Sequence, residues 1–126
     1  MAKKQGIYWC QICGNTIEMI EAKEPNVVCC GQEMQLMEEK TQEQGEEKHV
    51  PILKKTEYGV SVTVGSVAHP MEENHYIKLV EVLKGDNVIA GKWLYPGDKP
   101  EATFCLHNND NISARIYCNI HGAWKN

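Results

Sequence analysis

The sequence predicts an all-β protein in which a small metal-stabilised N-terminal module precedes an antiparallel β-sandwich. Four of the six cysteines lie at or before Cys30, which indicates a metal-bound module. Val60, Val62 and Val64 then alternate with polar residues, as in a strand with one buried face. Turn residues recur at short intervals after this strand, and no long helical pattern is present. The 126 residues, 42% hydrophobic, suit one modest domain and a small appendage.

Three segments follow from the composition. Residues 1–37 are too few to build an apolar core alone, so a bound metal has to supply the missing stability. Residues 38–48 are polar and lack apolar periodicity, which is typical of a linker. Residues 49–126 form the expected sandwich domain.

The expected strands of the sandwich are separated by turn signals such as Gly85-Asp86 and Pro96-Gly97-Asp98. They lie near residues 50–54, 60–64, 76–83, 88–95, 102–107 and 112–118. Their short, regular spacing favours an antiparallel sandwich over other all-β folds.

Charge and composition exclude several classes of partner. The net charge is −4 and no lysine-rich cluster is present, so we expect neither nucleic acid nor an anionic membrane surface as a partner. No apolar run is long enough for a signal peptide or a membrane span. We therefore expect a cytoplasmic protein, whose cysteines in a reducing compartment are metal ligands or free thiols.

The N-terminal cysteines have the spacing of a four-sulfur metal site. Two residues separate Cys10 from Cys13, which lets both thiolates converge on one ion, and Cys29 and Cys30 complete the set. Cys29 and Cys30 are poorly suited to a disulfide, because a disulfide between neighbouring cysteines closes a small, strained ring that includes their peptide bond. Spacing alone leaves iron and zinc both open, including a zinc ribbon.

Four of the five histidines fall at predicted strand ends or in loops, where sites are usually assembled. They are His49, His69, His75 and His121. Cys118 shares strand parity with Ala114 and Ile116, so its sulfur should point into the sandwich. His121 follows three residues later, a spacing that can place thiolate and imidazole on one ion. The local pattern by itself indicates only a possible metal site.

Four sequence blocks together resemble the desulfoferrodoxin family of two-iron superoxide reductases. They are Cys10-x-x-Cys13 with Cys29-Cys30, Glu47-Lys48-His49-Val50-Pro51, His69-Pro70-Met71-Glu72-Glu73-x-His75, and Cys118-Asn119-x-His121-Gly122. The resemblance implies a desulforedoxin-like module with iron on Cys10, Cys13, Cys29 and Cys30, and a neelaredoxin-like, immunoglobulin-like sandwich. It also implies a second iron within a square of His49, His69, His75 and His121, with Cys118 as the axial ligand.

By the same resemblance, the chain reduces superoxide to hydrogen peroxide by one electron at the ferrous site, without releasing dioxygen. Lys48 is then expected to attract the superoxide anion, and Glu47 to occupy the sixth coordination position once the iron is ferric. The four-thiolate iron is coordinatively closed and can act only as an electron carrier or a structural staple. The resemblance further implies a rubredoxin-like electron donor and a homodimer.

Three alternative functions remain open from the sequence: a rubredoxin-type electron carrier, a zinc-ribbon module fused to a binding sandwich, and dismutation of superoxide. The chain departs from the family pattern at Ile116, where the family often has an acidic residue, and at Ala123, where it has histidine. We interpret Cys105 as a free thiol and His107 as a surface residue. Trp93 and Trp124 are interpreted as core or rim aromatics.

Overall fold

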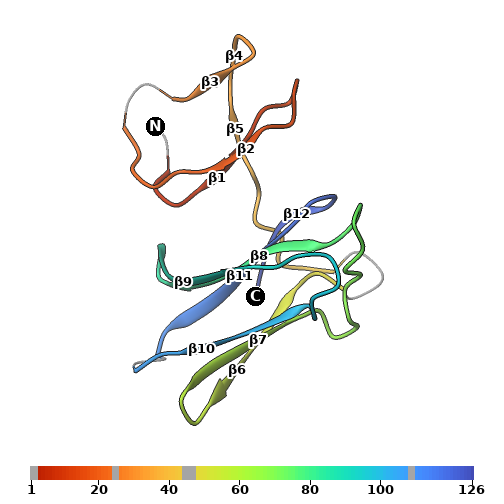
Figure 1. The fold of residues 1–126 in the computed structure, drawn as a ribbon. Coiled ribbons are helices and arrows are strands. Elements are labelled where there is room, and N and C mark those ends of the chain that lie inside the picture. Colours follow the sequence, from red (N-terminus) through yellow and green to blue (C-terminus); the bar gives the residue numbers. More distant parts are fainter. Residues whose placement is uncertain (1–2, 24–25, 44–47, 108–109) are drawn as a thin grey trace. The chain divides into compact units, whose positions relative to one another are not determined.

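The computed structural model describes residues 3–23, 26–43, 48–107 and 110–126, and the described residues form strands and turns without a helix. The strands are β1 (Ile7–Trp9), β2 (Thr16–Glu18), β3 (Val28–Cys29), β4 (Gln32–Glu33), β5 (Gln35–Leu36), β6 (Pro51–Thr56), β7 (Gly59–Val64), β8 (Ile77–Lys84), β9 (Asn87–Trp93), β10 (Glu101–Cys105), β11 (Ile112–Cys118) and β12 (Gly122–Lys125) (Figure 1). The described part of the chain therefore offers no helix that is long and apolar enough to cross a membrane.

The chain divides into two compact units, residues 1–38 and 39–126. In the first unit β1 pairs with β2 and β5, and β3 pairs with β4. Among the described residues, its buried hydrophobic cluster is Tyr8, Cys10 and Met34, with Ile17, Met19, Ala22 and Cys29 partly buried against it. So small a core supplies little hydrophobic stabilisation, in agreement with the expectation that a metal has to staple this unit.

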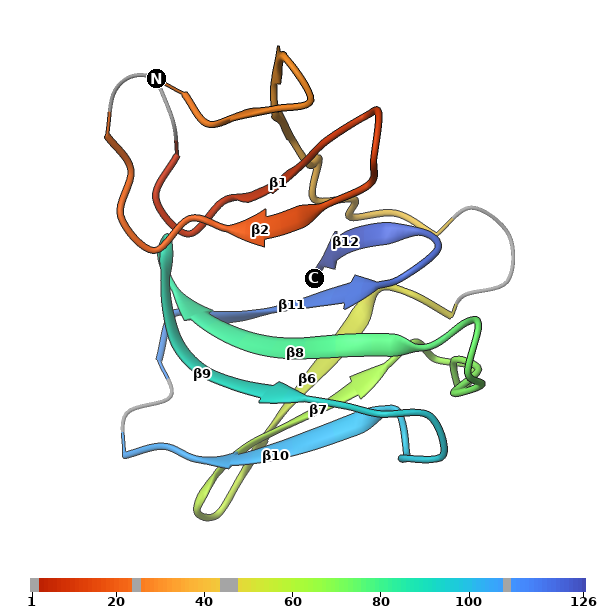
Figure 2. The ribbon, with the colours of Figure 1, turned by 45° about the horizontal axis from the view of Figure 1, so that its top comes forward.

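The second unit is a sandwich of two antiparallel sheets, in the orders β10-β7-β6 and β12-β11-β8-β9 (Figure 2). This arrangement confirms the predicted fold class. The predicted strands agree with β6 to β11 within two residues at every end, while the short strand β12 and the strands of the first unit were not predicted.

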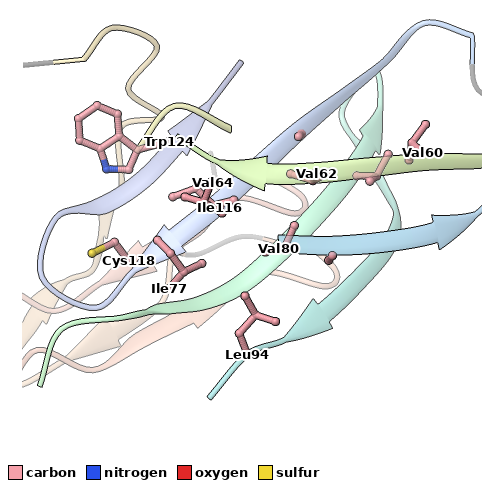
Figure 3. Packing of buried hydrophobic residues seen from close by; sticks show 12 residues of the cluster. Val60, Val62, Val64, Ile77, Val80, Leu94, Ile116, Cys118 and Trp124 are labelled. Carbon is pink, nitrogen blue, oxygen red and sulfur yellow. The ribbon is translucent and has the colours of Figure 1, made fainter. Parts of the chain in front are cut away.

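The core of the sandwich follows from strand alternation. Val60, Val62 and Val64 on β7 are fully buried and share one hydrophobic cluster with buried valines of β8. Cys118 belongs to this cluster and has no exposed surface, as its strand parity predicted. Figure 3 shows Cys118 and Trp124 at the end of the cluster where Val64 also lies.

Residues 39 and 40, which the sequence placed in a linker, make specific contacts with the sandwich. Arg115 on β11 donates hydrogen bonds to Glu81 on β8 at 2.8 and 2.9 Å and to Glu39 at 3.0 Å. The main chain of Lys40 bonds to Ala123 and Lys125 of β12. Residues 39 and 40 are therefore held against β11 and β12.

Candidate metal centres

The four N-terminal cysteines converge in the first unit. Their sulfur atoms all lie within 4.8 Å of one another. The Sγ atoms of Cys13 and Cys29 are 3.6 Å apart and those of Cys29 and Cys30 are 4.0 Å apart. Sulfur atoms on a tetrahedral ion with bonds of about 2.3 Å are separated by about 3.8 Å, so the cluster fits one four-coordinate metal.

The turn between β3 and β4 explains how two adjacent cysteines reach one site. Cys29 pairs with Gln32, which leaves Cys30 and Gly31 as a two-residue hairpin loop. Both have positive φ, 54° and 77°, as a type I′ turn requires. A residue with a β-carbon is disfavoured at the first of these positions, so the presence of cysteine there indicates that the thiol itself is needed.

Backbone amides around Cys10 stabilise a thiolate. The N–H of Cys13 donates to Cys10 Sγ at 3.5 Å, and the N–H of Asn15 donates to Cys13 Sγ at 3.5 Å. Amide hydrogen bonds from Cys13 and Ile12 lower the pKa of Cys10 to about 6. Hydrogen bonds with the neighbouring thiols raise the pKa of Cys30 to about 12. Without a bound metal, some of the four thiols therefore keep their protons. A cation that binds to all four sulfur atoms has to displace these protons.

The second cluster lies at one end of the sandwich and comes from four separate segments. His49 precedes β6, His69 and His75 lie in the connection between β7 and β8, Cys118 ends β11, and His121 lies in the turn before β12. Their candidate ligand atoms all lie within 4.8 Å of one another.

The four imidazoles form a closed ring in the order His49, His69, His75 and His121. Neighbouring ring centroids are 4.8, 4.8, 5.0 and 4.7 Å apart around this circuit, with the ring planes 63 to 81° from parallel. His49 Nε2 lies 3.1 Å from His121 Nδ1, close to the roughly 3 Å expected for adjacent nitrogens on an ion with bonds of about 2.1 Å.

Cys118 lies against this ring from the core side. Its Sγ is 3.5 Å from His69 Nε2 and 3.8 Å from His121 Nδ1. Burial raises the pKa of Cys118, and amide hydrogen bonds from His121 and Ile120 oppose that rise. His121 is exposed and His49 is partly exposed, so solvent reaches the ring while the sulfur stays shielded.

The ring nitrogens of the histidines also fit a metal. His75 Nε2 is buried and has no hydrogen-bond partner among the described residues, which is costly unless the lone pair binds a cation. His69 Nδ1 is 2.7 Å from the carbonyl oxygen of Pro70, a contact that directs its Nε2 toward Cys118. Burial, with the charges of the other histidines, lowers the pKa of His49 to about 4. Neutral imidazoles at neutral pH are the form that binds a metal.

Both units of the chain match known protein families. The family model described as desulfoferrodoxin matches residues 41–126, and the model for the desulfoferrodoxin N-terminal domain matches residues 2–37. The chain belongs to the desulfoferrodoxin family. Its relatives include a desulfoferrodoxin homolog of Archaeoglobus fulgidus and the desulfoferrodoxin of Nitratidesulfovibrio vulgaris, each 50% identical over 99% of this chain and 98% of the relative.

Solved structures of similar fold agree with this membership. The superoxide reductase of Treponema pallidum has a TM-score of 0.73 at 26% identity and covers 99% of both chains. The one-iron superoxide reductase of Giardia intestinalis has a TM-score of 0.56 at 32% identity and covers 64% of this chain and 96% of its own. The four-cysteine cluster and the histidine ring with its cysteine are consistent with the two iron centres of a desulfoferrodoxin.

Two further predicted site residues precede His49 in the sequence. The pKa of His69 is lowered mainly by burial, then by the charges of two neighbouring histidines, and least by the charge of Lys48. Glu47 lies outside the described residues. Cys105 and His107 are exposed and belong to neither cluster, as interpreted from the sequence.

Three residues beside the histidine ring were missed by sequence reasoning. Trp124 stacks on His49, Lys40 lies with its Nζ 5.0 Å from the centroid of the Trp124 ring, and Glu43 bonds to the main chain of His49. A sequence signal for Trp124 is its position three residues after His121, whereas Lys40 and Glu43 lie in a segment whose polarity is typical of a linker.

Proposed function

We propose that this desulfoferrodoxin-family chain is a superoxide reductase, which converts superoxide to hydrogen peroxide by one electron and two protons without forming dioxygen. The proposal rests on the ring of four imidazoles and on the buried Cys118 sulfur that lies against it. Five ligands of this kind suit iron, and a ring reached by solvent on one side suits a small anionic substrate. The names of the relatives point to the same activity.

Iron bound by this cluster supplies the single electron, and the protein residues provide binding, orientation and protons. We assign His49, His69, His75, His121 and Cys118 as ligands of that iron. Cys118 is shielded in the core, and its thiolate would donate electron density to an iron held by this cluster. The neutral imidazoles leave the site with a low positive charge that favours an anion.

Lys48 is proposed to attract superoxide. A cation beside an exposed metal site raises the encounter rate of an anion even when the whole protein is acidic. Lys48 directly precedes His49, a proposed ligand, and this supports a position beside the site. Glu47 is proposed as the carboxylate that would occupy the sixth coordination position of the ferric iron, in place of the peroxide product.

The four-cysteine cluster is proposed to hold a second iron, on Cys10, Cys13, Cys29 and Cys30. Four thiolates fill the coordination sphere of a tetrahedral ion, so this centre has no position for superoxide and serves as an electron carrier or a staple. A rubredoxin-like protein is proposed as the donor of electrons. We further propose a homodimer in the cytoplasm.

The deciding experiment mixes anaerobically reduced protein with a known amount of superoxide and quantifies peroxide and dioxygen together. Peroxide equal to the superoxide consumed, with no dioxygen and one His/Cys iron oxidised for each superoxide, is the expected result. Half as much peroxide with matching dioxygen would mean dismutation. If the protein does not accelerate the loss of superoxide, the remaining interpretations are an electron carrier and a zinc module.

Lys48→Met and Lys54→Met form a matched pair for the role of Lys48. Lys54 lies on β6, further along the chain. Lys48→Met is expected to slow the bimolecular reaction with superoxide and to weaken its dependence on ionic strength, whereas Lys54→Met should change neither by a comparable amount. Equal effects of the two variants would remove Lys48 from the proposal.

A further inference from the structure

Glu43 accepts hydrogen bonds from two residues, His49 and Val50, that precede the first strand of the sandwich. The His49 N–H lies 3.1 Å from Oε1 and 3.0 Å from Oε2, and the Val50 N–H donates to Oε2 at 2.6 Å. The Glu43 side chain is only 19% exposed. A largely buried carboxylate with two amide donors makes charge-assisted hydrogen bonds, which are stronger than neutral ones.

The hydrogen bonds of Glu43 are to the main chain of His49 and Val50 and not to the His49 ring. His49 Nδ1 lies 3.8 Å from Glu43 Oε1, which is beyond hydrogen-bond distance. His69 is different, since its own Nδ1 lies 2.7 Å from a carbonyl oxygen. The orientation of His49 is therefore fixed indirectly, through the position of its α-carbon.

Two contacts complete the placement of the His49 ring. The ring stacks on Trp124 with centroids 4.5 Å apart and planes 15° from parallel. Its Nε2 then points into the cluster, 3.1 Å from His121 Nδ1. Trp124 fixes the plane of the ring, while the Glu43 hydrogen bonds fix the backbone from which the ring projects.

We infer that Glu43 is a positioning residue of the His/Cys metal centre, which holds His49 in the imidazole ring by bonding the amides of His49 and Val50. The inference rests on the proposed assignment of His49 as an iron ligand. Glu43 contacts no reacting atom, so its effect is expected on metal retention and on the properties of the iron. Removing a partner that orients a metal ligand typically lowers metal affinity by about 10- to 100-fold.

The test measures the rate at which iron passes from the two-iron protein to a chelator. Loss from each centre is followed by its own absorption, so the four-thiolate iron in the same chain is an internal reference. Glu43→Ala is expected to accelerate loss of the His/Cys iron by about 10- to 100-fold, and to leave loss of the four-thiolate iron unchanged. Glu57→Ala, in the exposed turn between β6 and β7, is the matched control and should change neither rate.

Two conservative variants separate hydrogen bonding from charge. Glu43 Oε2 lies within hydrogen-bond distance of both amides, so the carbonyl oxygen of Glu43→Gln can replace it, and we expect a loss rate nearer to wild type than to Glu43→Ala. Glu43→Asp keeps the charge but is one methylene shorter, so it should lose iron as Glu43→Ala does. This pair also provides the test if Glu43→Ala does not fold.

Two readouts distinguish positioning from general stabilisation. The midpoint potential and the absorption band of the His/Cys iron should shift in Glu43→Asp, and amide hydrogen exchange should rise at His49 and Val50 while β8 and β11 keep their protection. Unchanged iron loss in Glu43→Ala, wild-type behaviour of Glu43→Asp, or equal acceleration at both centres would overturn the inference. Failure of superoxide reduction with iron retained would instead contradict the proposed function.

Discussion

His49 and Trp124 stack with their ring centroids 4.5 Å apart and their planes 15° from parallel. Trp124 is 2% exposed and belongs to the core of the sandwich, so the stack connects the metal site directly to the core. Its Nε1 donates to the carbonyl oxygen of His121 at 3.1 Å, and Lys40 Nζ donates to the same oxygen at 3.1 Å. One indole thereby supports two of the four histidines.

Replacing Trp124 should therefore weaken both stability and iron binding. Trp124→Leu removes the stack and leaves a cavity, and we expect the free energy of unfolding to fall by about 3 kcal/mol. Trp124→Phe keeps an aromatic face against His49 but loses the Nε1 donor, so its effect should be smaller. Urea unfolding and iron content after dialysis measure the two effects. Trp93→Leu is the control because Trp93 is 62% exposed, and a similar loss in that variant would contradict the role of the stack.

Gly65 restricts the position of Lys48. Gly65 has a φ of 81°, and a β-carbon there would lie 2.5 Å from the carbonyl carbon of Lys48. Gly65→Ala is therefore expected to push Lys48 and His49 outward, which should slow the reaction with superoxide and accelerate iron loss. Gly85→Ala is a matched control, because Gly85 has a φ of 61° but nothing within 4 Å of the added carbon.

Both glycine variants carry the backbone cost of a left-handed residue, of order 1 kcal/mol. Only Gly65→Ala adds a steric overlap beside the site. Stopped-flow rates with superoxide and thermal unfolding, measured on both variants, separate the two effects. Equal superoxide rates in the two variants would show that the contact between Gly65 and Lys48 has no influence on the site.

The fold could be predicted because its causes are local in the sequence. The alternation of Val60, Val62 and Val64 determines which face of β7 is buried, and the same parity on β11 placed Cys118 in the core. The short strands of the first unit could not be predicted in this way. Two or three residues are too few to show a period, and turn geometry at Cys30 and Gly31 decides the pairing of β3 with β4.

The metal ligands could be predicted from the sequence, whereas the residues that surround them could not. The cysteine pair spaced by two residues indicates a metal by itself, whereas the histidines come from separate segments that only the fold brings together. Their grouping was predicted from family resemblance. Lys40, Glu43 and Trp124 were missed because their roles depend on contacts between distant segments: a cation over an indole, a carboxylate on two amides, and a ring against a ring.

The stability of the metal-free sandwich should depend on pH with a definite sign. Burial lowers the pKa of His49 to about 4 and also lowers the pKa values of His69 and His121. The unfolded chain, with histidine pKa values near about 6.5, therefore takes up protons first as the pH falls. The free energy of unfolding should be highest above pH ~7 and should decrease as the pH falls through ~6.5 toward ~4.

Urea unfolding of chelator-treated protein between about pH 7.5 and about pH 5 measures this slope, above the range in which carboxylates dominate. His49→Gln should flatten the dependence, because one of the shifted groups is gone. His107→Gln is the control, since His107 is exposed and lies outside the cluster. A slope that His49→Gln leaves unchanged would argue against burial of neutral imidazole at this site.

Removal of one N-terminal ligand should affect the two units differently. Cys10 is both a candidate metal ligand and one of the buried residues in the cluster of Tyr8, Cys10 and Met34. Cys10→Ser is therefore expected to lose the four-thiolate iron and to unfold the first unit, because a structural metal site contributes its binding free energy to folding. Iron content should fall by half, and hydrogen exchange should become fast at the amides of β1.

The sandwich should keep its iron and its reaction with superoxide, since its ligands all lie within residues 49–121. Loss of that reaction in a variant that retains the His/Cys iron would mean that the four-thiolate centre takes part in turnover.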